Sequence, residues 1–356
     1  MRLFPLSIFF IFILIPSSLM TFATSDLTDS DQNQTPWAFV VIGDTQDSVM
    51  DTKFGINPFL PNLFKAIATE KPDFILHTGD CISGEYTSDN SPIAGNFTGM
   101  YGHFMKAATP VYNYSSHSGI PIYTIRGNHD NGNRYEGNES LKAAYLLTIA
   151  RDLPTNGPEG ETQLTYSFSH KGAMFIGIDE YIPHDGKTAT VNQEWLDSVL
   201  TDTSTPYIFV WGHSPAYPLN INGIDPYTMS LFPEDRDAFW NSLTSHKIPI
   251  YFCGHYHLYC RGQKDETWQI TGGTGGGALG GFNPDTVDPN LEVAYPKEKV
   301  LAKSQGYGYS VITVDITNGT ITVVQKQYMN KQGAWKIMDL FILPVSHKTR
   351  NLLVMR

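Results

Sequence analysis

The stretch YFCGHYHLYC, residues 251–260, places two histidines directly after a run of apolar residues. Pro249–Phe252 is short and rich in aromatic and β-branched residues, which predicts a strand that ends before Gly254. His255 and His257 therefore follow a strand end. Neutral imidazole is the commonest side-chain metal ligand, and with one residue between them the two rings can point at two neighbouring ions. Alone, the pattern is a weak signal, since two polar loop histidines are an equally good interpretation.

Four other predicted strands also end in loops that carry potential metal ligands. In open α/β sheets, binding sites form beyond the carboxyl ends of strands, so we expect these loops to meet at one site. The strands are Trp37–Ile42, Phe74–His77, Pro121–Ile125 and Pro206–Trp211, and the loop residues are Asp44, Gln46, Asp80, Asn128, His129 and His213.

The order of elements predicts an α/β layout in one domain, residues 37–345. Cys81–Gly119 is expected to be a loop-rich insertion beside the site, in which a helix near Met100–Ala108 is one interpretation. Residues 165–178 predict a hairpin. Apolar residues at helical spacing predict a helix over Pro58–Thr69. Further helices are expected over Leu141–Ala150, Asn192–Leu200 and Pro233–His246, the last of which opens on Pro and acidic residues, as suits a helix N-terminus. Three alternating or β-branched runs predict closing antiparallel strands, at Tyr307–Ile316, Thr320–Gln327 and Trp335–Leu343.

The charge balance limits the classes of partner. Lys and Arg number 24 against 35 Asp and Glu, a formal net charge of −11. Non-specific nucleic-acid binding relies on clustered cations, so we expect no nucleic-acid partner. The same charge is compatible with a small phosphorylated substrate held by metal ions.

Residues 1–23 predict an export signal. Arg2 gives a positive end, Leu3–Ile15 is almost wholly apolar, and Thr21-Phe22-Ala23 resembles a cleavage site. We expect cleavage at or near the end of this segment, a secreted or periplasmic protein, and no membrane span after signal removal. An uncleaved anchor is the alternative. Residues 24–36 predict a flexible lead-in and residues 346–356 a C-terminal tail.

Three cysteines are too few for a disulfide framework. Cys253 and Cys260 can pair across the histidine loop in an oxidising compartment, which leaves Cys81 free. The favoured interpretation is that all three are small buried apolar residues. Five N-x-S/T sequons matter only if the host glycosylates exported proteins, and they lie at Asn33, Asn96, Asn113, Asn138 and Asn318.

The candidate ligands suit hard or borderline metal ions. Oxygen donors combined with imidazoles favour Mn, Fe, Zn or Mg over soft copper chemistry. A carboxylate placed between two cations bridges them and offsets part of their repulsion. Such a pair of ions can hold the attacking and leaving oxygens of a displacement at phosphorus, and it lowers the pKa of a bound water.

The complete set of motifs resembles the calcineurin-like metallophosphoesterases. Their pattern D-x-[HQ], G-D, G-N-H-[DE], G-H and G-H-x-H occurs here in the same order, from Asp44 to His257. The resemblance covers residues 37–343. It implies the family fold, an α/β fold with two β-sheets packed face to face and flanked by helices, in four αββα layers. It also implies a hydrolase that acts on phosphoric ester bonds.

The resemblance further implies a role for each residue. Asp80 would bridge two divalent or trivalent metal ions. His129 would not bind metal but would stabilise the transition state or protonate the leaving alkoxide, a step that imidazole can perform near neutral pH. The remaining ligands would be Asp44, Gln46 and His257 for one ion and Asn128, His213 and His255 for the other.

The implied reaction is hydrolysis of phosphate mono- or diesters by attack of a metal-bound hydroxide at a dinuclear metal centre. The alternative function is a non-catalytic exported binding protein on the same scaffold. The filled ligand positions and the intact His129 favour the enzyme.

Three departures set the chain apart within this resemblance. Most members have His at the position of Gln46. The amide oxygen of Gln is a weaker metal ligand than imidazole, so we expect one of the two metals to bind less tightly. Ser83 lies where purple acid phosphatases, the secreted relatives, have a metal-binding Tyr. We therefore expect a related but distinct protein without the tyrosinate–iron colour. The arginine-bearing stretch that follows the bridging Asp in protein phosphatases is also missing.

Other residues near the motifs keep two interpretations. Arg126 can contact a substrate phosphate, but a structural role is favoured. Gly272–Gly281 lacks the context of a phosphate loop and is expected to turn beside the metals. Six aromatic residues either floor a substrate pocket or form the insertion's own core, namely Tyr86, Phe97, Tyr101, Phe104, Tyr112 and Tyr114.

Overall fold

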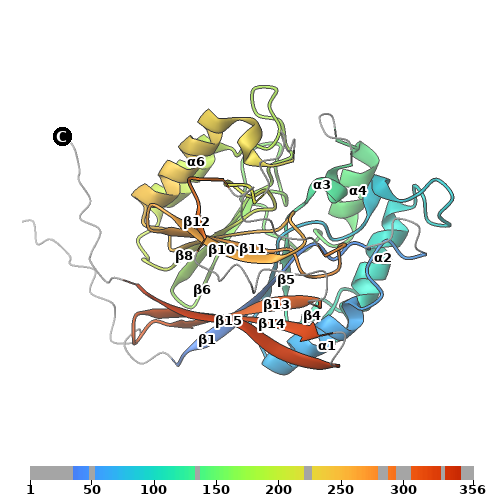
Figure 1. Ribbon diagram of the computed structural model, residues 1–356. Helices are drawn as coiled ribbons and strands as arrows, with labels where there is room; N and C mark the ends of the chain where they lie inside the picture. The colour runs from blue at the N-terminus through green and yellow to red at the C-terminus, as the bar shows by residue number, and fades with distance from the viewer. Residues whose placement is uncertain are drawn as a thin grey trace, which may run out of the picture.

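Two β-sheets stack face to face in the computed structural model, with helices on their outer sides (Figure 1). This arrangement confirms the predicted α/β fold class. The structure describes residues 35–47, 53–132, 137–219, 227–279, 288–293, 306–329 and 333–345. The expected signal peptide, nearly all of the lead-in and the expected C-terminal tail lie outside these residues.

The first sheet joins the start of the domain to its end. Its central strand β1 (Trp37–Ile42) pairs in parallel with β2 (Ile75–His77), which pairs in parallel with β5 (Ile122–Thr124). The three loops that follow these strands therefore leave from the same edge. The other side of β1 pairs with an antiparallel meander, and the strand order is β15-β14-β13-β1-β2-β5. The meander strands are β13 (Gly308–Asp315), β14 (Thr320–Met329) and β15 (Ala334–Pro344).

The second sheet has the order β12-β10-β11-β9-β8-β7-β6. Its central strands β7, β8, β9 and β11 run parallel, so the loops after β8 and β9 also share an edge. The bounds are β6 (Tyr166–His170), β7 (Ala173–Gly177), β8 (Ile208–Trp211), β9 (Ile250–Cys253), β10 (Tyr259–Lys264), β11 (Thr267–Gly272) and β12 (Glu292–Val293).

The helices follow the predicted apolar spacing. Helix α1 begins at Leu60 and has Pro61 in its first turn, where an N–H has no partner within the helix. It buries Leu60, Leu63, Phe64 and Ile67 on one stripe. No helix among the described ranges is long and apolar enough to cross a membrane. The helices are α1 (Leu60–Glu70), α2 (Phe97–Ala107), α3 (Asn128–Asn131), α4 (Glu139–Leu147), α5 (Gln193–Asp202) and α6 (Pro233–Ser245), with short 3₁₀ turns η1 (Gly84–Tyr86) and η2 (Met229–Leu231) and a two-stranded hairpin of β3 (Tyr112–Asn113) and β4 (Ser118–Gly119).

Aromatic rings fill the space between the two sheets. Phe39 of β1 is fully buried, and its ring centroid lies 5.2 Å from that of Phe175 on β7 and 5.1 Å from that of Phe209 on β8. Phe252 of β9 lies 6.2 Å away in an edge-on contact. These contacts hold the two sheets in the register that brings their loop edges together.

The cysteines are structural. Cys81, Cys253 and Cys260 are all buried free thiols. The favoured interpretation is confirmed, and Cys253 and Cys260 do not pair across the histidine loop.

We predict that Phe39→Ala lowers the free energy of unfolding by about 3–5 kcal/mol, since it opens a cavity between the sheets. Urea unfolding followed by circular dichroism measures the change. The control is Leu147→Ala, at a side chain that is 72% exposed, where we expect a change within about 0.5 kcal/mol. A Phe39→Ala protein as stable as the control would contradict this packing.

Candidate metal centre

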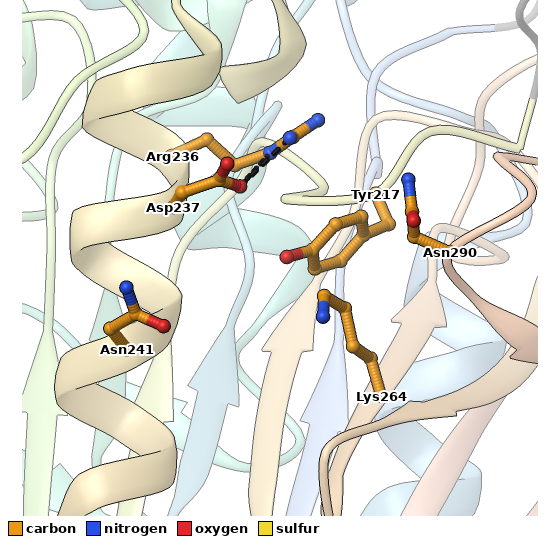
Figure 2. Close-up of a pocket in the computed structure, with 6 residues that line it drawn as sticks. All are labelled: Tyr217, Arg236, Asp237, Asn241, Lys264 and Asn290. Atoms are coloured by element: carbon orange, nitrogen blue, oxygen red, sulfur yellow. Dashed lines mark hydrogen bonds and ion pairs between the residues drawn. The ribbon is translucent and has the colours of Figure 1, made fainter.

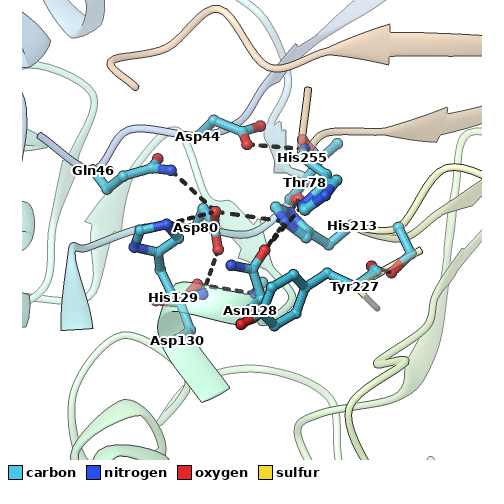
Figure 3. Close-up of polar contacts among 12 residues, drawn as sticks. Asp44, Gln46, Thr78, Asp80, Asn128, His129, Asp130, His213, Tyr227 and His255 are labelled. Carbon is cyan, nitrogen blue, oxygen red and sulfur yellow. Dashed lines mark hydrogen bonds and ion pairs between the residues drawn. The ribbon is translucent and has the colours of Figure 1, made fainter. Parts of the chain in front are cut away.

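Five loops converge where the two sheets meet, and all eight residues proposed from the sequence lie in them. Figure 3 shows Asp80 at the middle of polar contacts with Gln46, His129 and His213. The loops follow β1, β2 and β5 of the first sheet and β8 and β9 of the second. Every strand end that the sequence analysis identified therefore contributes to one site.

Three of the site residues adopt left-handed backbone conformations. The φ angles are 57° at Asp44, 55° at Asp80 and 70° at His255. Side chains other than glycine adopt this region at a cost, and such residues cluster at functional sites. The turns at these residues aim their side chains or backbone donors back into the site.

The first group of candidate ligands is Asp44, Asp80 and His257, whose ligand atoms all lie within 4.8 Å of one another. His257 Nδ1 lies 2.9 Å from the carbonyl oxygen of Ala278, so this nitrogen carries the proton of the neutral ring. The lone pair on its Nε2 then faces Asp44 Oδ1 at 3.6 Å. Asp44 Oδ2 is buried without any hydrogen-bond partner. Acceptors that face one another without a proton suit a cation.

Gln46 belongs to this group in an orientation that the sequence did not predict. Its amide nitrogen Nε2, and not the expected carbonyl oxygen, lies 3.0 Å from Asp80 Oδ2 and 3.0 Å from His257 Nε2. The oxygen Oε1 is buried without a partner. Both neighbours are acceptors, so they pair with the amide nitrogen rather than with the oxygen. A half-turn of the amide would exchange the two atoms and present the oxygen to a cation.

The second group contains Asp80, Asn128, His213 and His255. His213 Nδ1 donates to the carbonyl oxygen of Thr78 at 2.7 Å, which fixes the ring and leaves a lone pair on Nε2. That Nε2 lies 3.1 Å from Asn128 Oδ1 and 3.5 Å from Asp80 Oδ2. His255 Nδ1 lies 3.0 Å from the same Asn128 oxygen. Four ligand atoms again converge, and Asp80 is common to both groups.

His129 lies beside the two groups. Its backbone N–H donates to Asp80 Oδ1 at 2.8 Å, and its ring Nδ1 donates to the carbonyl oxygen of Ser83 at 3.1 Å. The other ring nitrogen, Nε2, lies 3.9 Å from Asp80 Oδ2. The side chain is 13% exposed, whereas the ring of His213 is fully buried.

Burial disfavours every charged form in this site. It raises the pKa of Asp80 to about 7 and raises that of Asp44 well above its usual value, with the two carboxylates repelling each other. It also lowers the pKa of His257 to about 4 and that of His213 well below its usual value. A cation reverses the penalty on the carboxylates, because it stabilises their charge and favours neutral imidazoles.

Two buried acidic residues, Glu180 and Asp130, hydrogen-bond the backbone of the loops that carry the ligands. The sequence analysis proposed no role for either of them. Glu180 accepts hydrogen bonds from the N–H of His213 and of Ser214 and from the hydroxyl of Tyr251. Asp130 accepts from the N–H of Cys81 and of Gly127 and from the Tyr101 hydroxyl. Asp130 ends the G-N-H-D motif, but Glu180 follows β7 without any motif. Only the fold could reveal its position.

Arg126 is structural, as favoured. Its side chain is buried, and its Nε lies 2.6 Å from Asp179 Oδ2. A second nitrogen donates to Asn131, so the guanidinium does not face the candidate ligands.

Backbone packs closely against the ligands where glycines occur. A β-carbon at Gly127 would lie 2.1 Å from Asp80 Oδ1, and one at Gly277 would lie 2.6 Å from the His257 ring. The described part of the glycine-dense segment, which ends at residue 279, thus turns beside the candidate ligands as expected. Gly277 also donates its N–H to the Asp44 carbonyl oxygen at 2.8 Å.

A separate surface pocket lies between α6 and β10 and shares no residue with the metal centre (Figure 2). Arg236 and Lys264 lie against the ring of Tyr217, at 4.9 and 5.5 Å from its centroid. Both cations are paired, with Asp237 at 2.8 Å and Asp265 at 2.5 Å. We assign this pocket no part in the chemistry. Its lining residues are Tyr217, Arg236, Asp237, Asn241, Lys264 and Asn290.

Two curated relatives are acid phosphatases. Purple acid phosphatase 13 of Arabidopsis thaliana is 24% identical over 237 residues, which are 64% of this chain and 40% of the relative. Tartrate-resistant acid phosphatase type 5 of Sus scrofa is 25% identical over 241 residues, 62% of this chain and 63% of the relative. The chain thus spans less than two thirds of the length of either relative.

A solved structure and a family model agree with this similarity. Purple acid phosphatase PPD1 from yellow lupin (Lupinus luteus) seeds has a TM-score of 0.62 at 16% identity, over 88% of this chain and 54% of that one, and shares the fold. The family model described as calcineurin-like phosphoesterase matches residues 38–259, more than half of the 356 residues. The chain therefore belongs to the calcineurin-like phosphoesterase family.

Proposed function

We propose that the protein hydrolyses phosphate mono- or diesters with two metal ions bound at the candidate metal centre. One observation carries the proposal: acceptor atoms of carboxylate, amide and imidazole groups converge around Asp80, with His213 Nε2 at 3.1 Å from Asn128 Oδ1 and at 3.5 Å from Asp80 Oδ2, and His257 Nε2 at 3.6 Å from Asp44 Oδ1. Such an arrangement is repulsive until cations enter it. Family membership supports phosphoester chemistry, and the names of the two curated relatives support phosphatase activity.

The residues divide into two sets around a shared carboxylate. Asp44, His257 and Gln46, after rotation of its amide, would hold one ion. Asn128, His213 and His255 would hold the other, and Asp80 would contact both. Bound ions would polarise the phosphoryl oxygens and activate a water molecule. The protein's own contribution is to fix the lone pairs in advance, since the rings of His213 and His257 are anchored to backbone carbonyls.

His129 is suited to act on the leaving group. Its Nδ1 is anchored to the Ser83 carbonyl oxygen, so Nε2 points towards the space beside Asp80. Since Nδ1–H is committed, Nε2 donates a proton only when the ring is protonated. A phosphate anion beside the ring favours that form. His129 would then protonate the departing ester oxygen.

Metal-free protein tested on a panel of phosphate mono- and diesters, with Mn, Zn, Fe or Mg added back, tests the proposal. Hydrolysis that depends on the added metal is expected. Protein that binds two metal ions but cleaves none of the esters would instead favour a non-catalytic binding protein on this scaffold.

We predict that Asp80→Ala and His129→Ala fail in different ways. Asp80→Ala removes the charge shared by two cations, so bound metal per chain should fall together with activity. His129→Ala should keep both ions and lose about 10²–10⁴-fold in kcat. The loss should shrink for nitrophenyl esters, which depart without a proton, and be largest for alkyl esters. Elemental analysis and steady-state kinetics measure the two effects.

The matched control is His103→Ala, at a half-buried ring that hydrogen-bonds the Phe54 carbonyl oxygen and packs edge-on against the Phe54 ring, outside the site. It should retain both metal and activity. Equal loss of metal in Asp80→Ala and His129→Ala would contradict the assignment of His129 as a non-ligand.

We predict that Gln46→His tightens one of the two metal sites without abolishing hydrolysis, because imidazole is a better donor to first-row divalent ions than an amide. Calorimetric titration of Zn²⁺ into metal-free protein measures the affinity. Gln263→His, at the far end of β10, is the control and should leave it unchanged. If Gln46→His leaves the affinity unchanged or weaker, Gln46 is not a ligand.

We further propose that the protein is exported and loses about its first two dozen residues, as the apolar Leu3–Ile15 run and the following small residues favour. Mass spectrometry of the mature protein from its native host should find an N-terminus near Thr24. An intact Met1 in a soluble cytosolic pool would contradict export.

A further inference from the structure

Three buried side chains close a ring of hydrogen bonds between the turns that carry two of the candidate ligands. Thr45 directly follows Asp44 in the loop after β1. Cys81 directly follows Asp80 in the loop after β2, and His77 is the last residue of β2. The side chains of Thr45, His77 and Cys81 are all fully buried. The sequence analysis gave none of the three a role in the site.

The direction of each hydrogen bond in the ring can be assigned. The Thr45 hydroxyl donates its one proton to the carbonyl oxygen of Cys81 at 3.0 Å. His77 Nε2 lies 3.0 Å from the same hydroxyl oxygen, so this nitrogen carries a proton and donates it. Burial lowers the pKa of His77 to about 3, which keeps its ring neutral and leaves Nδ1 as an acceptor. The Cys81 sulfur lies 3.5 Å from Nδ1, so the thiol donates to it and closes the ring.

The ring joins two turns that are costly to form. Asp44 and Asp80 both have left-handed backbone, with φ angles of 57° and 55°, and each is followed by a residue of the ring. The backbone N–H of Thr45 also donates to the Asp80 carbonyl oxygen at 2.8 Å. Left-handed residues persist only where the surrounding structure determines their conformation several times over. The ring supplies part of that constraint, because it binds the side chain of one turn to the backbone of the other.

We propose that this hydrogen-bonded ring, formed by Thr45, His77 and Cys81, sets the spacing of the two carboxylates that hold one metal ion. The inference rests on the proposed function for its two metal ions. Two ligands of that ion, Asp44 and Asp80, lie on the turns that the ring joins. Three of the four ligands of the other ion lie on the loops after β5, β8 and β9. The ring should therefore govern the binding of one ion far more than that of the other.

Two substitutions of Thr45 separate the hydrogen bonds from the packing. Thr45→Val keeps the shape of the side chain but removes the hydroxyl, which opens the ring. It should weaken one of the two Zn²⁺ binding steps by about 10-fold, the lower end of the range for loss of a hydrogen bond that supports a metal site. The other step should stay unchanged. Thr45→Ser keeps the hydroxyl and removes only a methyl group, so it should bind both Zn²⁺ ions as the wild type does.

The experiment is calorimetric titration of Zn²⁺ into metal-free protein, with thermal unfolding of each variant. Thr267→Val is the matched control. It also removes a fully buried threonine hydroxyl, which donates to the Ile248 carbonyl oxygen at 2.9 Å. Thr267 begins β11, at the opposite edge of the sheet from the ligand loops. This variant should leave both Zn²⁺ steps unchanged.

A second measurement tests the ring in metal-free wild-type protein, so it does not depend on how any variant folds. Nuclear magnetic resonance of protein with isotope-labelled histidine reports which ring nitrogen carries the proton. The expected result is a neutral His77 ring with its proton on Nε2, since this nitrogen donates to Thr45. A His77 proton on Nδ1 would overturn the proposal.

Unchanged Zn²⁺ affinity in Thr45→Val would also overturn the proposal. An equal loss in Thr45→Ser or in Thr267→Val would do the same, because the loss would then come from packing or from general stability. Wild-type protein that binds two Zn²⁺ ions and cleaves no ester would refute the proposed function, while the Zn²⁺ titrations would still decide the role of the ring. Wild-type protein that binds no metal would overturn both.

Discussion

The buried carboxylate of Asp80 is the constraint on which the site depends. Its Oδ1 accepts the backbone N–H of His129, and its Oδ2 accepts the amide of Gln46. Its own carbonyl oxygen accepts the backbone N–H groups of Thr45 and Gln46 at 2.8 and 3.1 Å. One residue therefore joins the loops after β1, β2 and β5. Burial, and after it repulsion from Asp80, raises the pKa of two more buried carboxyl groups, those of Asp44 and Asp130. Without cations the protein holds this charge at a cost, and the fold supplies the framework that keeps it there.

That framework is a consequence of strand direction. Parallel strands deliver their carboxyl ends to one edge, and the aromatic contacts of Phe39 hold the edges of two sheets against each other. The candidate ligands lie on the turns that follow these strands, and the packing of the two sheets brings those turns together. Buried charged side chains stabilise these turns. Glu180 fixes the start of the His213 loop through backbone N–H groups, and the buried pair of Arg126 and Asp179 lies under the loop after β5.

Local sequence patterns predicted the strand ends and the candidate ligands, but not the features that depend on contacts between distant segments. The five strand ends followed from short apolar runs that stop at polar residues, and β1 and α1 have nearly the predicted bounds. Strand β10 was missed because Tyr259–Lys264 becomes polar and does not alternate, and only its pairing with β11 makes it a strand. The orientation of the Gln46 amide could not be predicted, since it depends on two acceptors from distant loops. Of the six aromatic residues near the insertion, Tyr101, Phe104 and Tyr114 are buried and belong to its core, whereas Tyr86 reaches the site. The spacing alone gave no means to separate them.

The left-handed backbone at Asp44, Asp80 and His255 has an evolutionary consequence. Each such residue costs of order 1–2 kcal/mol relative to a conformation that suits its side chain. Together the three consume a sizeable part of the roughly 5–15 kcal/mol by which a domain is stable. Substitution of any of the three by glycine would remove this conformational cost. If selection acted on folding stability alone, such substitutions would accumulate and the site would be lost. A descendant that serves only as a scaffold is then expected to be more stable than this chain, and glycine or asparagine at these three turns would mark it.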